Sequence, residues 1–196
     1  MKSLRESLLD NGLISKTDKM IKDEIEAFLK ENYLGAAIKI SNKPNKDGKY
    51  EVSSTTDIEV KNTNITSLTN GMFIWTVVGG SFYCNDCYSL KSLEGAPKKV
   101  KKDFYCPDCN SLKSLEGAPK EVGGDFYCSH CMSLESLEGA PKKVGETFDC
   151  SVCDSLKSLE GAPKKVGAIF HCSNCAGKFT TKDVKKVSNV KYEIMC

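Results

Sequence analysis

The sequence predicts a β-solenoid, a chain wound into stacked coils of similar length and sequence. Three observations lead to this prediction. Cysteine pairs of the form CxxC recur every 22 residues, a phenylalanine precedes each pair by two residues, and the segment SLxSLEGAP follows the first four pairs. A fixed period of roughly 20–50 residues is typical of solenoids, because one unit cannot bury its apolar side alone and must stack on copies of itself.

Each position of the repeat forms a column along the chain. Phe104-Tyr105-Cys106 alternates between apolar, exposed and apolar positions, which predicts a short strand with one buried face. The glycine and proline of SLEGAP argue against a helix in the second half of the copy, so we expect an extended return segment. The columns expected in the interior are those of Phe104, Cys106, Cys109, Leu112, Leu115 and Val122.

The residues before the repeats predict a cap. Residues 17–33 show the apolar spacing of a helix with Thr17 as its N-cap, and a shorter helix is expected from Ser3 to about Leu9. The segments AAIKI and KYEV flank NKPNKDG and predict a hairpin with a long turn. We interpret the helix at 17–33 as a cap rather than as a partner-binding helix.

A degenerate first coil is expected between this hairpin and the first cysteine pair. One period before Phe82, Cys87, Leu90 and Val100 stand the apolar residues Val60, Ile65, Leu68 and Val78. In this interpretation Asn62 and Ile65 replace the two cysteines.

The repeat pattern is lost after Cys175. There TTKDVKKV predicts a short helix and VKYEIM a final strand, which together would form a C-terminal cap. The expected organisation is an N-terminal helical segment at 1–35, a β-hairpin with the degenerate first repeat at 36–80, the 22-residue repeats at 81–175 and the C-terminal cap at 176–196.

The repeat resembles the leucine-rich repeat, L-x-x-L-x-L-x-x-(N/C)-x-L. Val100, Phe104 and Cys106 stand at leucine positions, and Cys109 stands at the asparagine or cysteine position. The leucines and proline that follow are most similar to the short repeats of bacterial effector proteins. The resemblance covers roughly residues 78–175 and implies a leucine-rich-repeat solenoid with a small α+β N-terminal cap and a short helix/strand C-terminal cap. One departure is that the next leucine follows Cys109 by three residues instead of two.

Three roles are open for the CxxC pairs: zinc sites, a redox centre or a buried ladder. The spacing CxxC-x18-CxxC suits four-cysteine zinc sites. However, each four-cysteine site takes two pairs, so one of the five pairs would be left without a partner. Both cysteine columns also coincide with buried positions of the repeat, where a free thiol packs as a small apolar group. A redox thiol would need exposure. We predict a packed ladder without metal or other cofactor, and the alternative is a zinc-stabilised repeat protein with a structural or nucleic-acid-associated role.

The copies differ mainly on the strand and between the two cysteines. Drift at exposed positions would explain this variation, but the lysines after the proline are also exposed and hardly vary. In leucine-rich repeats the varying side chains lie on the concave face that recognises partners. The resemblance therefore implies a partner-binding face made of Tyr83, Tyr105, Tyr127, Asp149, His171, Asp86, Asp108 and His130.

Charge and motifs argue against two other function classes. The formal net charge is +2, and residues 84–171 are slightly acidic, so the net basic stripe of a nucleic-acid binder is not expected. Neither His130 nor His171 stands in a nucleophile or metalloprotease motif, and no phosphate-binding glycine loop occurs. We therefore predict no enzyme and no catalytic residues.

The first residues of the chain include Glu6 and Asp10 and no long apolar run, so we expect neither a secretory signal nor a membrane span. The eleven cysteines are then expected to be reduced, in the cytoplasm. The chain as a whole is similar to small repeat proteins of gut bacteria and their tailed phages. This resemblance implies a phage or bacterial interaction protein that engages a host factor; the sequence does not identify the protein partner or the oligomeric state.

Overall fold

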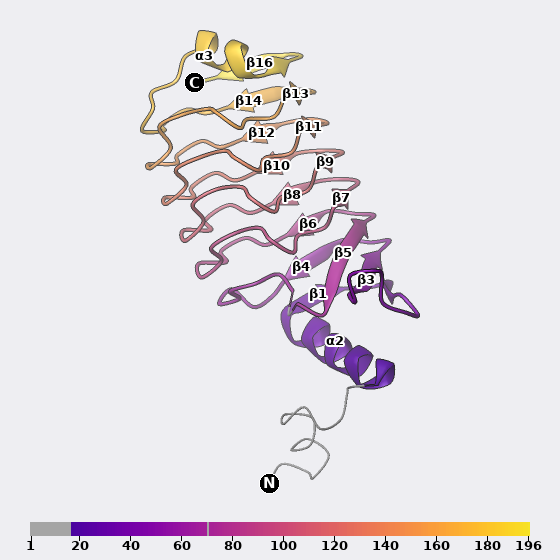
Figure 1. Cartoon of the computed structure of the whole chain (residues 1–196). Helices are drawn as coiled ribbons and strands as arrows, with labels where there is room; N and C mark the ends of the chain where they lie inside the picture. Colours follow the sequence, from indigo (N-terminus) through magenta and orange to yellow (C-terminus); the bar gives the residue numbers. More distant parts are fainter. Residues whose placement is uncertain (1–16, 70) are drawn as a thin grey trace.

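The computed structural model describes residues 17–69 and 71–196, which form a β-solenoid of about seven turns. Figure 1 shows the coils stacked along one axis, with helix α2 (Asp18–Asn32) at one end and helix α3 (Thr181–Val187) at the other. This confirms the predicted fold class, a solenoid with a helix in the cap at each end. The helix expected from Ser3 to about Leu9 lies outside the described residues.

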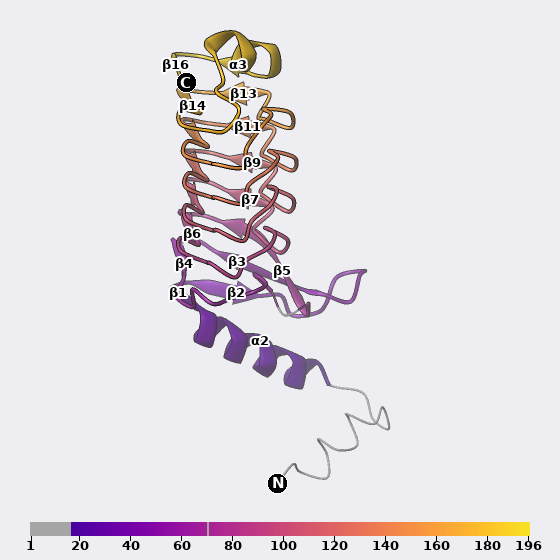
Figure 2. The same ribbon diagram turned by 90° about the vertical axis from the view of Figure 1, so that its left-hand side faces the viewer.

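The coils build two mostly parallel sheets, which lie side by side along the solenoid (Figure 2). Sheet A contains, in spatial order, β1 (Tyr33–Gly35), β4 (Ile58–Val60), β6 (Phe82–Tyr83), β8 (Phe104–Tyr105), β10 (Phe126–Tyr127), β12 (Phe148–Asp149), β14 (Ile169–His171) and β16 (Glu193–Met195). Sheet B contains β15 (Asn189–Val190), β13 (Lys165–Val166), β11 (Lys143–Val144), β9 (Glu121–Val122), β7 (Lys99–Val100), β5 (Phe73–Val78), β3 (Tyr50–Ser54) and β2 (Ile38–Ile40).

The strands of sheet A are the short strands that the repeat predicts. Phe104 pairs in register with Phe82 and with Phe126, and the three rings stack in the interior with centroid distances of 5.4 and 5.2 Å. Sheet B is formed by the residues for which the sequence predicted only an extended return segment. In each regular coil a valine of this segment points inwards while the residue before it is exposed, as at Val100 and Lys99.

The N-terminal cap is built as predicted. Helix α2 begins after Thr17, whose hydroxyl accepts a hydrogen bond from the Met20 N–H, and it buries Ile25 and Leu29 against the first coils. Strands β2 and β3 form the expected antiparallel hairpin, and β3 then pairs in parallel with β5. The helix therefore covers the end of the core, which supports its interpretation as a cap. No helix within the described residues has the length and apolar character needed to cross a bilayer.

The degenerate first coil exists, but its register differs from the expectation. Val78 pairs with Val100, as predicted, whereas Ile58 lies opposite Phe82. The assignment of Val60 to the phenylalanine column is therefore wrong by two residues. Ile58 and Phe82 are 24 residues apart, two more than the 22-residue period. Counting back by one period from Phe82 therefore misplaces β4.

The same shift moves the polar residue of the first coil into a different column. The Ile65 N–H donates to the Asn62 carbonyl at 3.0 Å, as the Leu90 N–H donates to the Cys87 carbonyl at 3.0 Å. Asn62 therefore corresponds to the second cysteine of a pair rather than to the first. Its side-chain amide donates to the Asn32 side-chain oxygen at the end of α2, so it joins the first coil to the cap.

The C-terminal segment forms a further coil with two strands rather than the one strand expected. Val190 pairs with Val166 in sheet B, and Ile194 pairs with Phe170 in sheet A. Helix α3 takes the place of the leucine-containing half of the repeat, which lengthens this coil to 24 residues between the paired positions. Cys196 then lies in the first-cysteine column, with its sulfur 3.1 Å from that of Cys172.

Candidate functional site

The ten cysteines of the five CxxC pairs are buried in two columns inside the solenoid, as the ladder prediction required. Burial raises the pKa of the thiols of Cys128, Cys131 and Cys150, which keeps them protonated near neutral pH. Within residues 17–69 and 71–196, no three His, Cys, Asp or Glu side chains are grouped so that they could hold a metal ion. The columns thus act as packing and hydrogen-bonding elements of the core.

The second cysteine of each pair after the first also has a polar role that the sequence did not reveal. Its thiol donates a hydrogen bond to the carbonyl oxygen of the first cysteine in the preceding coil. The bonds run from Cys109 to Cys84 (3.2 Å), from Cys131 to Cys106 (3.3 Å), from Cys153 to Cys128 (3.4 Å) and from Cys175 to Cys150 (3.0 Å). These bonds satisfy carbonyl groups of the residue that directly follows each strand of sheet A.

The tyrosines of sheet A form a continuous column on the outside of the sheet. Tyr83 and Tyr105 stack at 5.0 Å with an angle of 8° between the rings, and Tyr105 and Tyr127 stack at 5.0 Å with an angle of 4°. The in-register pairing of β6, β8 and β10 places them there. All three residues are half-buried, because each ring covers its neighbour and leaves the remaining surface of the column to solvent.

Carboxylates lie beside this column. The Asp125 N–H donates to an oxygen of Asp103 at 2.9 Å, and the Thr147 N–H donates to an oxygen of Asp125 at 2.8 Å, so backbone groups of successive coils hold both carboxylates in place. Burial and the negative charges of Asp103 and Asp125 raise the pKa of Tyr105 to about 12. The Tyr105 hydroxyl therefore stays neutral in an electronegative setting.

The column continues into Asp149 and His171, where its chemistry changes. An oxygen of Asp149 lies 3.2 Å from His171 Nδ1, and His171 Nε2 lies 2.6 Å from the hydroxyl of Ser173. The other Asp149 oxygen accepts hydrogen bonds from the Ser151 N–H at 2.8 Å and the Ser151 hydroxyl at 2.6 Å. The sequence prediction included the aspartate and the histidine but missed both serines. Each serine stands two residues after the outward-facing strand residue of its coil, and this shared spacing is the sequence signal that could have identified them.

The other expected site residues, Asp86, Asp108 and His130, lie in a separate column at the turn that follows each strand. Their φ angles are 56°, 58° and 57°, and Val152 and Asn174 share this left-handed conformation at 54° and 56°. Asp, Asn and His are the non-glycine residues that tolerate this conformation best. The backbone conformation therefore explains the choice of Asp, His and Asn in this column, but not that of Val152.

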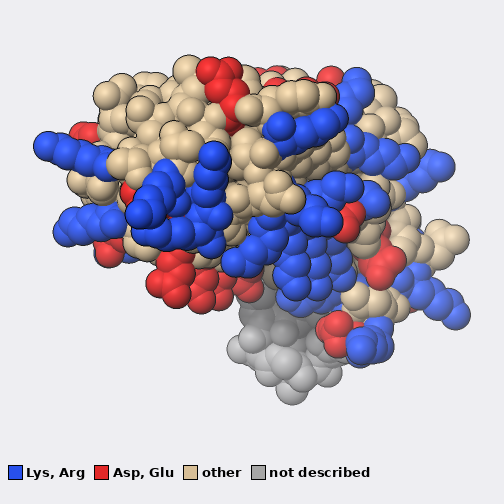
Figure 3. Space-filling model, turned by 90° about the horizontal axis from the view of Figure 1, so that it is seen from above, with Lys and Arg blue, Asp and Glu red and all other residues tan. Residues whose placement is uncertain are grey.

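Lysines occupy much of the exposed face of sheet B. Lys99 pairs with Glu121, and Lys143 lies between Glu121 and Lys165 in the same register. The ion pair between Lys99 and Glu121, at 3.7 Å, joins two exposed side chains and so contributes little to stability. Seen from the C-terminal end, lysine side chains project from more than one side of the molecule (Figure 3).

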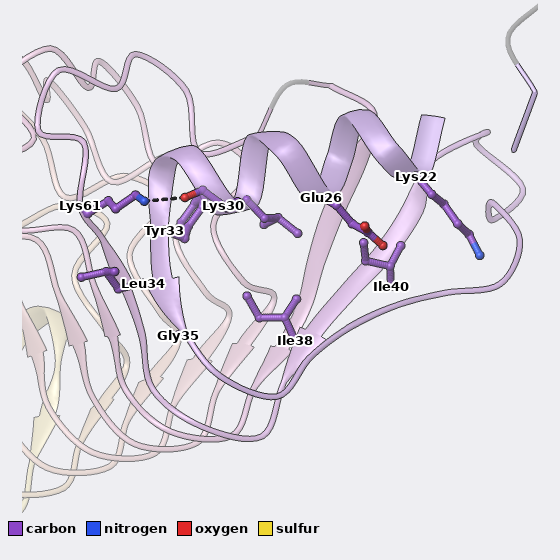
Figure 4. Close-up of a pocket in the computed structure, with 10 residues that line it drawn as sticks. Lys22, Glu26, Lys30, Tyr33, Leu34, Gly35, Ile38, Ile40 and Lys61 are labelled. Atoms are coloured by element: carbon purple, nitrogen blue, oxygen red, sulfur yellow. Dashed lines mark hydrogen bonds between the residues drawn. The ribbon is translucent and has the colours of Figure 1, made fainter. Parts of the chain in front are cut away.

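A cavity of about 640 Å³ lies beside the N-terminal cap, between α2 and strands β1 and β2 (Figure 4). Leu34, Ile38 and Ile40 line it, and Lys22 and Lys30 lie at its rim. Lys61 also contacts it, with its ammonium group donating to the Lys30 carbonyl. None of the site residues expected from the sequence lines this cavity. Among the described residues that line it, Glu26 carries the one carboxylate.

Comparisons of the chain with protein-family models, curated proteins and solved structures find no match.

Proposed function

We propose that this chain is a protein-binding module that recognises its partner through the exposed face of sheet A. The observation that supports this most is the column of Tyr83, Tyr105 and Tyr127, with rings 5.0 Å apart on the outer side of the sheet. Stacked tyrosines are rigid before binding, so a partner gains a large contact area with little loss of side-chain entropy. Binding of this kind requires no catalytic residue.

We further propose that the coils are leucine-rich repeats. Support comes from the inward-pointing Val, Phe and Cys columns and from the column of the second cysteine. At that position the Cys109 thiol and the Asn62 amide both donate hydrogen bonds, and the family pattern places asparagine or cysteine there. Following the wider resemblance, we propose a cytoplasmic protein of a phage or bacterium whose partner is a host factor.

The charges around the column favour a cationic partner segment. Asp103 and Asp125 lie along one side of the tyrosines, and Asp149 extends the column itself. Arginine and lysine side chains pair with carboxylates and also stack on tyrosine faces. The change from tyrosine to Asp149 and His171 gives the face a direction, along which a partner could be aligned.

Affinity capture with the intact chain, followed by measurement of Kd, tests this proposal. The double variant Tyr105→Ala/Tyr127→Ala should weaken a direct partner by about 2 kcal/mol or more, or roughly 30-fold in Kd, because interface energy concentrates in a few aromatic anchors. The matched control, Lys142→Ser/Lys143→Ser, changes an exposed residue of sheet B and the exposed residue before it, and should alter mainly the salt dependence.

Thermal melting of both variants checks that the solenoid remains folded. If the tyrosine variant binds normally while the lysine variant fails, the proposal is wrong and sheet B is the binding surface.

A further inference from the structure

The hydrogen-bonded chain from Asp149 through His171 to Ser173 connects a carboxylate, an imidazole and a hydroxyl. We propose that it is a nucleophilic site, in which Ser173 attacks small carboxylic esters, His171 is the general base and Asp149 orients the imidazole. The tyrosines of the proposed binding face take no part in this activity, whereas Asp149 and His171 belong to both that face and this site.

The hydrogen-bond partners fit one tautomer of the neutral imidazole, with its proton on Nδ1. Both Ser151 donors bind one Asp149 oxygen, so the other oxygen is free to accept from His171 Nδ1–H at 3.2 Å. Nε2 is then unprotonated and accepts from the Ser173 hydroxyl at 2.6 Å. This order of groups, with the base oriented by a carboxylate and touching the hydroxyl, is the arrangement that activates serine nucleophiles on unrelated folds.

The network is not a general consequence of the repeat. In the preceding coils the strand position holds Tyr83, Tyr105 or Tyr127. Ser129 occupies the same place in its coil as Ser173, but the residue two positions before it is a tyrosine rather than an imidazole base. Relative to the coil of Ser129, the strand residue changes in two adjacent coils, to Asp149 and to His171, while the serine two residues later is kept.

Ser173 is accessible to a small substrate. It lines a cavity of about 490 Å³ at the C-terminal end of the solenoid, together with Asn174, Lys178 and Phe179. Phe179 offers an apolar contact for a short acyl chain. The side chains of Asp149 and His171 remain only 13% and 25% exposed, which shields the base from water, while Ser173 lines the cavity.

A backbone donor stands next to the nucleophile. The Val152 N–H, one coil earlier, donates to the Ser173 carbonyl at 2.9 Å, but within the described part of the chain the equivalent Asn174 N–H has no carbonyl acceptor. The N–H of the residue after a serine nucleophile contributes to the oxyanion hole in hydrolases with a strained nucleophile turn. Asn174 adopts the left-handed conformation at φ 56° directly after the serine.

The reaction proceeds in two balanced steps. Ser173 Oγ forms a bond to the ester carbonyl carbon while its proton moves to His171 Nε2. The bond from that carbon to the alcohol oxygen then breaks, and the alcohol leaves with the proton. In the second step water attacks the acyl-serine, gives its proton to His171, and the acid leaves as Ser173 Oγ recovers its proton.

A fluorophosphonate probe on the purified full chain tests the nucleophile directly. Oγ attack on phosphorus releases fluoride and leaves a stable adduct, which peptide mass spectrometry should locate at Ser173. Ser173→Ala should abolish labelling, and His171→Gln should slow it by about 100-fold or more, because a positioned base contributes roughly that factor. Ser129→Ala, the matched control in the same column, should label at the wild-type rate.

Hydrolysis of p-nitrophenyl butyrate by the same variants provides the second measurement, with melting curves to confirm folding. Cys196→Ala removes the exposed thiol, which could itself react with this ester. Labelling of the wild type no greater than that of Ser173→Ala, or an adduct located at another residue, would overturn the proposal. Equal hydrolysis by wild type and Ser173→Ala would overturn it as well.

Discussion

The thiol of Cys131 donates a hydrogen bond of 3.3 Å to the carbonyl oxygen of Cys106 in the preceding coil. Both residues are fully buried, so water cannot replace this bond. Alanine would fill most of the same space but would leave the carbonyl group without a donor, which costs free energy in the interior. The first cysteine of the same coil differs, since the described residues offer no acceptor to the Cys128 thiol.

This difference predicts unequal effects of one substitution at two neighbouring cysteines. Cys131→Ser keeps a donor in place and should lower the free energy of unfolding by less than about 1 kcal/mol. Cys128→Ser buries a hydroxyl without a partner and should lower it by about 1–3 kcal/mol. Guanidinium unfolding in reducing buffer measures the free energy of unfolding of both variants. The control Lys142→Ser, at an exposed position, should change this free energy by about 0.5 kcal/mol or less. Equal losses at the two cysteines would contradict the ladder of thiol hydrogen bonds.

Close packing between coils makes a second prediction. Gly117 has φ 89°, and a Cβ there would overlap the backbone nitrogen of Glu94 in the preceding coil. Gly71 has a similar φ of 82° but open space around it. Gly71→Ala should therefore lower the free energy of unfolding by the backbone strain alone, about 1 kcal/mol. Gly117→Ala should lower it several times more or prevent folding. Similar melting temperatures for the two variants would show that the coils do not approach so closely.

Much of this fold follows from the period alone. Once Phe104, Cys106, Leu112 and Val122 recur at a constant distance, parallel stacking in register is the arrangement that buries all of them together. The aromatic column follows from the same register, because whatever stands beside a buried phenylalanine must stack on its copy in the next coil. The alternation of the strand is therefore enough to place Tyr105 on the outside of the sheet.

The ends of the solenoid could not be predicted in this way, because the period changes there. The pairs Ile58 with Phe82 and Ile194 with Phe170 each span 24 residues, so a constant step misses both. A better signal for the last coil is the spacing V-x-x-x-F-x-C of the regular repeats. It is found again at VKYEIMC from Val190 to Cys196, with isoleucine in place of the phenylalanine. The hydrogen bonds of Ser173 could not be predicted either, since they depend on side-chain rotamers in two coils rather than on the pattern of one.

Metal content separates the ladder from the zinc-stabilised alternative. If Cys109 and its counterparts are hydrogen-bonded thiols of the core, protein purified under reducing conditions should contain far less than about one equivalent of zinc. A chelator should then leave the melting temperature unchanged, because no folding free energy comes from metal binding. Elemental analysis and melting with and without chelator measure this. About two equivalents of zinc, with unfolding on chelation, would require the zinc-stabilised interpretation.

The left-handed turn between the two cysteines of each pair makes the last prediction. Val152 has φ 54°, although a β-branched side chain is strongly disfavoured there, whereas Asp108 adopts φ 58° with a residue type that tolerates it. Val152→Asn should therefore raise the free energy of unfolding by about 1 kcal/mol, because the strain of the valine disappears while its N–H can still donate to Ser173. Asp108→Val is the reverse change in an equivalent turn and should lower it by a similar amount. Chemical unfolding of both variants under the same reducing conditions gives the two values. If neither change alters stability, the turn does not hold the left-handed conformation, and the residue types in this column would then be better explained by partner recognition at Asp86, Asp108 and His130.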